Sequence, residues 1–155
     1  MAIFIFMKHK ILGAGILAFE KSTGKILFGR RGMKGEQPNT WSPFGGTFEK
    51  EDQMPRNTAI REFKEETGCK CSFQLSKMPY YINDGNQLRF YTYLAIFDNE
   101  FTPIINQESM DYQWFDLNSL PENLHPGVQE MMEKKLPELK KFRNYLLKRS
   151  DGHDE

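Results

Sequence analysis

Residues Gly45–Cys69 read GGTFEKEDQMPRNTAIREFKEETGC and are the most informative part of the sequence. Within it, Glu62, Glu65 and Glu66 stand at positions i, i+3 and i+4. A helix with this spacing projects all three carboxylates from one face. The stretch therefore predicts an acidic helix that is preceded by a glycine-containing loop.

The signals for this helix are local and agree with each other. Ala59, Ile60 and Phe63 are apolar residues at helical spacing. Pro55 suits the first helical position, because the missing N–H has no intrahelical partner there. Gly68 stands where a left-handed C-terminal cap belongs. These signals predict a helix over residues 55–67.

The acidic face has two interpretations. On an exposed surface, like charges at this spacing cost only a few tenths of a kcal/mol and need no ligand. In a cleft with an effective dielectric near 20, two charges about 4 Å apart repel by about 4 kcal/mol. A divalent cation removes that repulsion, and all-oxygen ligands favour Mg²⁺ or Mn²⁺ over zinc.

Gly45 and Gly46 end an extended segment just before the acidic helix. A paired glycine alone is most simply an ordinary turn. Without side chains, however, the backbone can approach a ligand closely and direct an amide or a carbonyl at a phosphate or a metal. The combination with the acidic helix at this separation favours a binding site.

The stretch resembles the box of the Nudix hydrolases, whose pattern is G-x5-E-x7-R-E-U-x-E-E-x-G-U, with U a bulky apolar residue. Residues 61–69 match the second half at every fixed position, with Cys69 as a small occupant of the last apolar place. Counting from Gly46, the acidic position falls on Asp52, and eight residues instead of seven separate it from Arg61. This one-residue insertion leaves open the roles of three acidic residues, Glu49, Glu51 and Asp52.

The resemblance implies an α+β fold of the Nudix type. This fold is an α/β/α sandwich around a mixed β-sheet, with a loop–helix–loop box and a C-terminal helix. The resemblance also implies one or more Mg²⁺ or Mn²⁺ ions as cofactor. The implied metal ligands are the carboxylates Glu62, Glu65 and Glu66 and the carbonyl of Gly46.

Other roles also follow from the resemblance. Arg61 is expected to orient the carboxylates by ion pairing. Many members supply another acid from a loop before a Trp-containing strand, and Glu108, ahead of Asp111, fits that pattern before Trp114. The implied catalytic residues are Glu62, Glu65, Glu66 and Glu108, and the candidate substrate contacts are Arg30, Arg31, Gly45 and Gly46.

The implied reaction is hydrolysis of the diphosphate linkage in a nucleoside diphosphate derivative by attack of water at phosphorus. Nucleoside triphosphates, ADP-ribose or nucleotide sugars, and dinucleoside polyphosphates all remain possible substrates. Two alternatives use the same fold: a non-catalytic module that senses a nucleotide, and an isoprenoid-diphosphate isomerase. The isomerase needs a Cys and a Glu in a deep hydrophobic pocket, whereas Cys69 and Cys71 flank the helix end.

Alternating apolar residues and turn signals outline the rest of the chain. A second helix is predicted over Gly127–Arg149, with Pro137 expected to kink or divide it. Strands are predicted at Ile3–Met7, Ile11–Phe19, Lys25–Arg31, a short segment within Trp41–Phe48, Cys71–Ile82, Leu88–Phe97 and Tyr112–Leu117. The alternation of strands and helices predicts one domain over residues 1–149, followed by a frayed tail at 150–155.

The composition excludes several classes of protein. The chain has 155 residues, with 21 Lys plus Arg and 21 Asp plus Glu, so its formal net charge is zero. This balance argues against a stable nucleic-acid complex. The small-molecule nucleotide expected as the partner is implied by the resemblance to the Nudix hydrolases. No apolar run reaches the roughly 20 residues of a membrane span. The two cysteines form no disulfide framework, which predicts a reducing, cytoplasmic location. The sequence does not decide between a monomer and a homodimer.

Overall fold

The computed structural model describes residues 10–152 of the chain. The strands, helices and one short 3₁₀ helix follow in this order: β1 (Ile11–Glu20), β2 (Ile26–Arg31), β3 (Trp41–Ser42), β4 (Phe44–Thr47), the 3₁₀ helix Lys50–Asp52, α1 (Pro55–Thr67), β5 (Gln74–Leu75), β6 (Tyr81–Asp84), β7 (Leu88–Phe97), β8 (Ser109–Phe115) and α2 (Pro126–Gly152).

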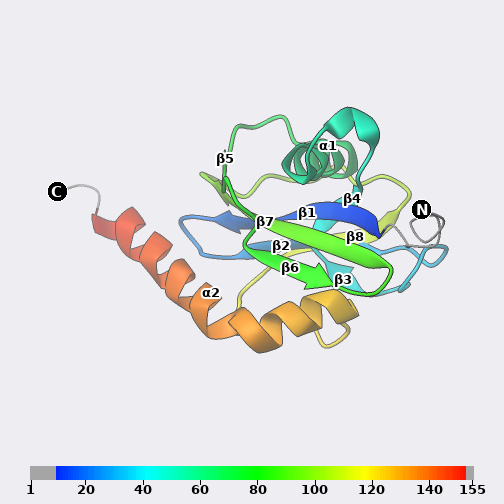
Figure 1. Cartoon of the computed structure of the whole chain (residues 1–155). Coiled ribbons are helices and arrows are strands. Elements are labelled where there is room, and N and C mark those ends of the chain that lie inside the picture. The colour runs from blue at the N-terminus through cyan, green and yellow to red at the C-terminus, as the bar shows by residue number, and fades with distance from the viewer. Residues whose placement is uncertain (1–9, 153–155) are drawn as a thin grey trace, which may run out of the picture.

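The strand β1 is the centre of an eight-stranded mixed sheet. It runs parallel to β7 in an unbroken register from Ile11 opposite Leu88 to Glu20 opposite Phe97. Along its other edge, β1 pairs antiparallel with β4 and then with β2. Figure 1 shows α1 on one face of this sheet and α2 on the other. The predicted α/β/α arrangement around a mixed sheet is therefore confirmed.

The side chains of successive residues in β1 point to opposite faces of the sheet, as the two-residue period of a strand requires. Toward α1, Ala14 and Ile16 pack in a cluster that includes Phe63 of the helix. Toward α2, Leu17 and Phe19 pack in a second cluster that includes Met131 and Leu139. Because both faces of β1 are buried, the strand reads as a continuous apolar run.

The first helix has the predicted bounds, Pro55–Thr67. Pro55 occupies its first turn, and Gly68 caps its end in the left-handed region with φ of 65°. The N–H of Gly68 donates to the carbonyl of Lys64 at 2.9 Å, which closes the last turn. These contacts fix the direction in which the acidic face points.

Other predicted bounds need correction. The extended segment Cys71–Ile82 contains only the short strand β5 and the start of β6, which continues to Asp84. The predicted strand Tyr112–Leu117 instead covers Ser109–Phe115. Helix α2 continues to Gly152, so the first residues of the predicted tail are helical. The predicted strand Ile3–Met7 and residues 153–155 lie outside the described residues.

Pro137 lies inside α2 without dividing it. Figure 1 shows that the helix changes direction in its middle part, as expected when a proline removes one backbone hydrogen bond. Within residues 10–152, no helix combines the length and the apolar composition that a membrane crossing requires.

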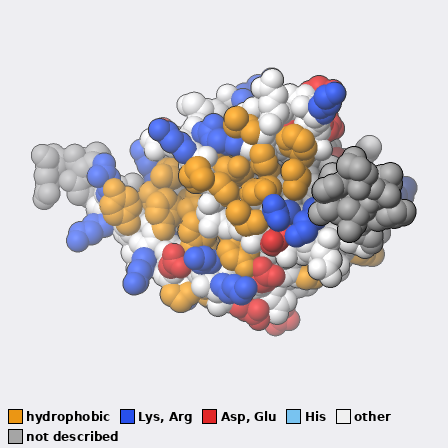
Figure 2. All heavy atoms as spheres, in the orientation of Figure 1, with side chains coloured by type: hydrophobic (Ala, Val, Ile, Leu, Met, Phe, Trp, Pro, Cys, Tyr) orange, Lys and Arg blue, Asp and Glu red, His pale blue; other side chains and the backbone are white. Residues whose placement is uncertain are grey.

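Figure 2 shows hydrophobic side chains gathered on the face that carries the β6–β7 side of the sheet, with Lys and Arg side chains around them. Among the large apolar residues of the chain, Met78, Ile82 and Tyr145 are exposed, with Met78 at 74%. Scattered exposed apolar side chains are normal for folded proteins.

We expect Leu139→Ala to lower the free energy of unfolding by about 2–5 kcal/mol, because it removes a fully buried side chain between α2 and the sheet. Urea unfolding followed by circular dichroism measures this change. Leu88→Ala is the matched control, since Leu88 is 44% exposed and its truncation should cost less than about 1 kcal/mol. Equal losses in the two variants would contradict the packing described here.

Candidate active site

Arg61 of α1 connects the loop to the acidic helix. Its guanidinium donates from Nε to Asp52 Oδ1 at 2.8 Å and from Nη2 to Asp52 Oδ2 at 2.9 Å. Nη2 also donates to the carbonyl of Thr47 at 3.1 Å. Nη1 donates to Glu62 at 2.9 Å and lies 3.3 Å from Glu65. One side chain thus fixes β4, the loop and two carboxylates of the helix.

Asp52 is the buried partner that holds Arg61. Its carboxylate also accepts from the hydroxyl of Thr58 and from the backbone N–H of Glu49, both at 2.8 Å. The hydrogen bonds from Arg61 hold the pKa of Asp52 well below its usual range, and Asp52 in turn raises the pKa of Arg61. The role that the sequence left open for Asp52 is therefore structural, directed at Arg61.

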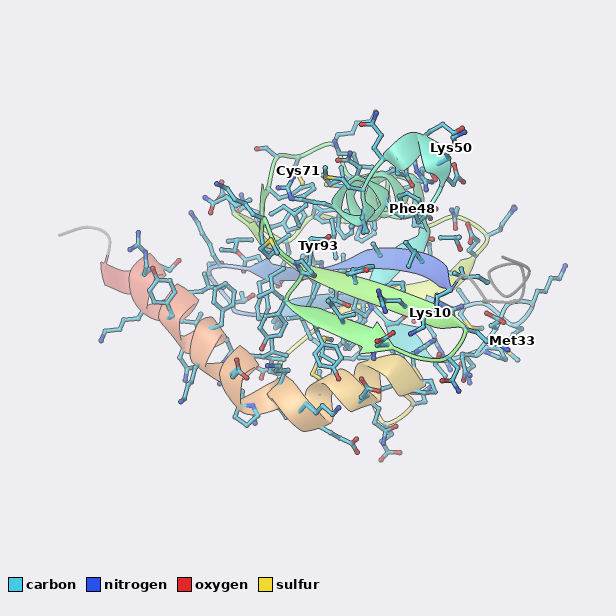
Figure 3. All side chains as sticks on the ribbon, in the orientation of Figure 1. Lys10, Met33, Phe48, Lys50, Cys71 and Tyr93 are labelled. Atoms are coloured by element: carbon cyan, nitrogen blue, oxygen red, sulfur yellow. The ribbon has the colours of Figure 1, made fainter. Side chains whose placement is uncertain are left out.

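The extra residue of the box is absorbed before α1 begins. Because α1 is regular from Pro55, only Gln53 and Met54 separate it from the 3₁₀ helix Lys50–Asp52. Gln53 has a positive φ of 69°, and Met54 is extended. Figure 3 shows Lys50 at the outer side of this loop. The insertion lengthens the turn and leaves the register of the acidic helix intact.

The paired glycines lie directly against the carboxylates. The N–H of Gly45 donates to Glu66 Oε1 at 3.1 Å. A Cβ atom added to Gly46 would lie 2.3 Å from the carboxyl carbon of Glu62. Position 46 must therefore lack a side chain if Glu62 is to keep its place. The structure brings together Gly45, Gly46, Glu62 and Glu66 of the predicted site.

Burial and like charges disfavour ionisation of these two carboxyls. Burial, together with the nearby charges of Glu62 and Glu108, raises the pKa of Glu66 to about 8. Burial also raises the pKa of Glu62, although its hydrogen bond to Arg61 acts in the opposite direction. Shifts of this kind concentrate at functional sites, because like charges are held together there at a cost in stability.

Glu65 lies on the outer side of this group. It is 56% exposed and paired with Arg61, whereas Glu62 is half-buried and Glu66 is buried. Among the described residues, no group of three or more His, Cys, Asp and Glu side chains is arranged so that it could hold a metal ion. The chemistry of the donors nevertheless fits a hard cation, since carboxylates with raised pKa values are stabilised by added positive charge.

The two strand-end arginines differ in their surroundings. Arg31 donates from Nε to the carbonyl of Glu36 at 2.8 Å, within its own loop. Arg30 lies over the ring of Trp41, and its buried Nε has no hydrogen-bond partner among the described residues. Within residues 10–152, no salt bridge joins either arginine to a carboxylate of α1. Their role as substrate contacts stays a prediction.

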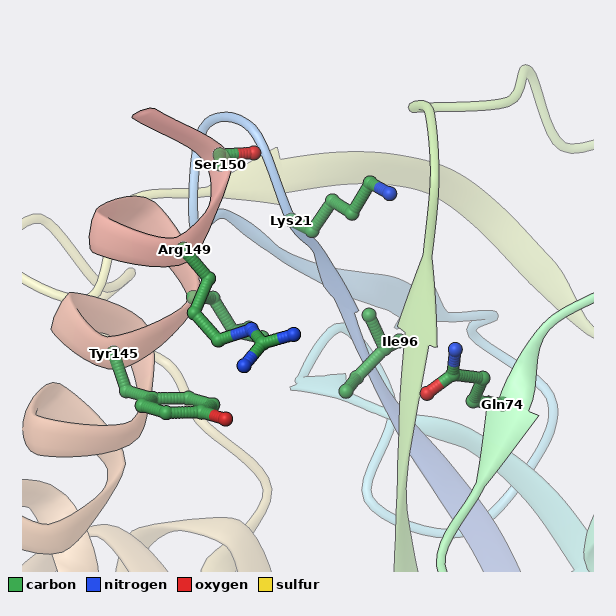
Figure 4. A pocket seen from close by; sticks show the side chains of 7 residues that line it. Lys21, Gln74, Ile96, Tyr145, Arg149 and Ser150 are labelled. Atoms are coloured by element: carbon green, nitrogen blue, oxygen red, sulfur yellow. The ribbon is translucent and has the colours of Figure 1, made fainter. Parts of the chain in front are cut away.

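A cavity of about 430 Å³ lies away from the box, lined by Lys21, Gln74, Ile96, Tyr145, Leu146, Arg149 and Ser150. Figure 4 shows these side chains between the end of α2 and the sheet. None of these residues belongs to the predicted site. The cavity therefore does not contribute to the acidic group.

The sequence predicted that Arg61 pairs with the carboxylates of the helix, but it did not identify Asp52 as the loop partner of Arg61 or the residues that support Asp52. Glu49 and Asp52 form a reciprocal cap over the 3₁₀ helix, a pairing that the spacing of two acidic residues three apart could have indicated. Thr58 could not have been identified in this way, because a buried threonine on a helix has no distinctive pattern in the sequence.

We expect Asp52→Asn to destabilise the protein at neutral pH, because it removes the charge that holds Arg61. The pKa of Asp52 is lowered in the fold, so its contribution is complete above the ordinary value near 3.8 and is lost as the pH falls below it. Urea midpoints of wild type and variant should therefore converge in acid. Asp98→Asn, in an exposed pair with Lys21, is the control and should have a smaller effect.

We expect Glu66→Gln to stabilise the protein at pH 8 when EDTA keeps it free of divalent cations. A carboxyl with a raised pKa costs stability progressively as the pH rises from its ordinary 4.5 toward about 8. The gain over wild type should therefore be small near pH 5 and larger at pH 8, as measured by urea unfolding. A gain that does not depend on pH would refute this account; Glu133→Gln, an exposed glutamate on α2, provides the baseline.

Comparisons with known proteins identify the fold and the family. The NUDIX domain profile matches residues 9–135. The human protein nucleoside diphosphate-linked moiety X motif 6 is 32% identical over 120 residues, which cover 74% of this chain and 37% of that protein. The chain thus corresponds to little more than a third of that relative.

Solved structures agree on the fold. The Nudix hydrolase RenU from M. smegmatis superposes with a TM-score of 0.70 at 20% identity, covering 87% of each chain. A bifunctional NMN adenylyltransferase/ADP ribose pyrophosphatase from Francisella tularensis, in complex with AMP and a manganese ion, gives 0.56 at 18% identity and covers 87% of this chain and 45% of its own. With the fold and the box in place, the chain belongs to the Nudix hydrolase family, whose members are generally pyrophosphatases.

Proposed function

We propose that this chain is a divalent-metal-dependent pyrophosphohydrolase that cleaves the diphosphate linkage of a nucleoside diphosphate derivative. One observation carries the proposal: Glu62 and Glu66 are held together against Gly45 and Gly46, and the pKa values of both carboxyls are raised. Such a group is unfavourable by itself and is stabilised by a cation.

The cofactor of the proposed reaction is Mg²⁺ or Mn²⁺. Glu62, Glu65 and Glu66 with the Gly46 carbonyl would hold it, and Glu65 would exchange its exposed pairing with Arg61 for this role. When bound, the cation neutralises the charge of the diphosphate and lowers the pKa of water. The manganese ion in the Francisella tularensis structure supports this choice by analogy.

The side chains of the protein orient the substrate and move the proton. Glu62, Glu65 and Glu108 are candidate acceptors for the proton of the attacking water. Glu62 and Glu65 pair with Arg61, whereas Glu108 makes no salt bridge among the described residues. Arg30 and Arg31 are both candidate donors to a phosphate oxygen, although the Nε of Arg30 is buried beside Trp41.

The substrate class is a nucleotide. Nucleoside triphosphates, ADP-ribose or nucleotide sugars, and dinucleoside polyphosphates are the candidates. The human relative is named for a moiety linked to a nucleoside diphosphate, which is consistent with this class of substrate. A panel of these compounds, assayed for phosphate, pyrophosphate and nucleoside monophosphate, identifies the preferred one. We also propose a cytoplasmic location, which the two free cysteines support.

We expect Glu66→Gln and Glu65→Gln each to lower kcat by at least about a hundredfold, since each removes a charged oxygen ligand. Circular dichroism should show that both variants keep the fold. The measurement is product release from the preferred compound of the panel in Mg²⁺ and in Mn²⁺. Glu133→Gln on the exposed side of α2 is the matched control and should retain the wild-type rate.

Wild-type rates in both site variants would overturn the proposal. A non-catalytic, nucleotide-sensing module is the second candidate, favoured by the insertion before Arg61 and by the engagement of Glu65 with that arginine. Binding of a nucleotide from the panel without product formation, in either metal, would establish this second function instead.

A further inference from the structure

Two cysteines meet directly after the acidic helix. The Sγ atoms of Cys69 and Cys71 lie 3.2 Å apart, and both cysteines are free. A separation of 3.2 Å leaves only a small movement before the sulfur atoms reach bonding distance.

The backbone at the end of α1 holds the two thiols on the same side. Gly68 turns the chain in the left-handed region, and the N–H of Cys69 donates to the hydroxyl of Thr67 at 3.2 Å. That hydroxyl in turn donates to the carbonyl of Phe63 at 2.6 Å. The thiol of Cys69 also lies 3.6 Å from the carbonyl of Cys71. The turn is therefore anchored to the helix and not only to its own residues.

The two thiols differ in access. Cys71 is exposed and Cys69 is buried, and Figure 3 shows Cys71 on the loop that leaves α1. Burial raises the pKa of the Cys69 thiol to about 12. An oxidant from solution therefore reacts first with Cys71. The buried thiol of Cys69 can react only in the second step.

We propose that Cys69 and Cys71 form a dithiol–disulfide redox site that reacts with small anionic disulfides of the glutathione type. The thiolate of Cys71 attacks one sulfur of the oxidant, forms a mixed disulfide and releases one glutathione thiol. Cys69 then loses its proton to solvent and attacks the sulfur of Cys71, which releases the second glutathione thiol. Two electrons pass from the cysteine pair to the oxidant, and the Cys69–Cys71 bond remains.

The charges around the pair suit an anionic oxidant. Lys70 lies between the two cysteines and is exposed, and the charge of Lys64 favours the thiolate of Cys69. Positive charge beside a thiol promotes the reactive thiolate and attracts carboxylates of the incoming molecule. The site is separate from the carboxylate group, and it does not depend on the proposed hydrolase activity.

The experiment uses the full chain, which contains only these two cysteines. The wild-type protein is incubated with excess glutathione disulfide and then alkylated with iodoacetamide without reductant. Its intact mass is measured by mass spectrometry. The expected product has lost two hydrogen atoms and carries neither glutathione nor an alkyl group. Treatment with dithiothreitol should return two thiols that can be alkylated.

Two variants test the order of the steps. Cys69→Ser should keep one glutathione on Cys71, because the second thiol is missing. Cys71→Ser should react at least about tenfold more slowly than wild type, because its remaining thiol is buried. If Cys69→Ser does not fold, as judged by circular dichroism, Cys71→Ser and wild type still decide the question, because position 71 is exposed.

Two results would overturn the proposal: a wild-type protein that retains one stable glutathione, or one in which both thiols are still alkylated after oxidation. The readout is mass, so either result leaves the hydrolase proposal untouched. Equally, a failure of the activity assay leaves the redox site untouched.

Discussion

The ion pair between Arg61 and Asp52 is the contact on which the rest of the site depends. The guanidinium is shared among Asp52, Glu62 and the carbonyl of Thr47, so a single side chain joins the loop, the strand and the helix. A planar guanidinium with five N–H donors can make several directed bonds at once, and lysine could not replace it. The burial of Asp52 makes the contact costly to break, because either partner alone would be an unpaired charge.

The contacts of Arg61 explain how the folded protein can hold a group of carboxylates that is unfavourable by itself. Glu62 and Glu66 repel each other and are poorly solvated, yet Phe63, which lies between them in sequence, is fully buried among aromatic rings on the α1 side of the sheet. Aromatic packing of this kind stabilises the helix independently of its polar face. Binding chemistry and stability are thus carried by opposite faces of one helix.

The sequence predicted what is local and failed where distant segments meet. Pro55 and Gly68 mark the ends of α1 by their own backbone preferences, and the structure has the same ends. The pairing of Asp52 with Arg61 was not predicted, because eight residues instead of seven separate the two and the acidic position of the pattern therefore stayed unassigned. The short strands β5 and β6 were merged into one, since both pair with β7 and neither has strong alternation of its own.

The parallel pairing of β1 with β7 sets the order in which this protein can be assembled during synthesis. The two strands are separated by nearly seventy residues, and α1 is made between them. The strands β1 and β4, on which α1 mainly packs, are translated before the helix. The strand β7 is added only after residue 97 has emerged, when Phe97 comes to lie 5.7 Å from Phe63. On the ribosome, the acidic helix can therefore dock on β1 and β4 first, and its aromatic contacts with β7 are completed later.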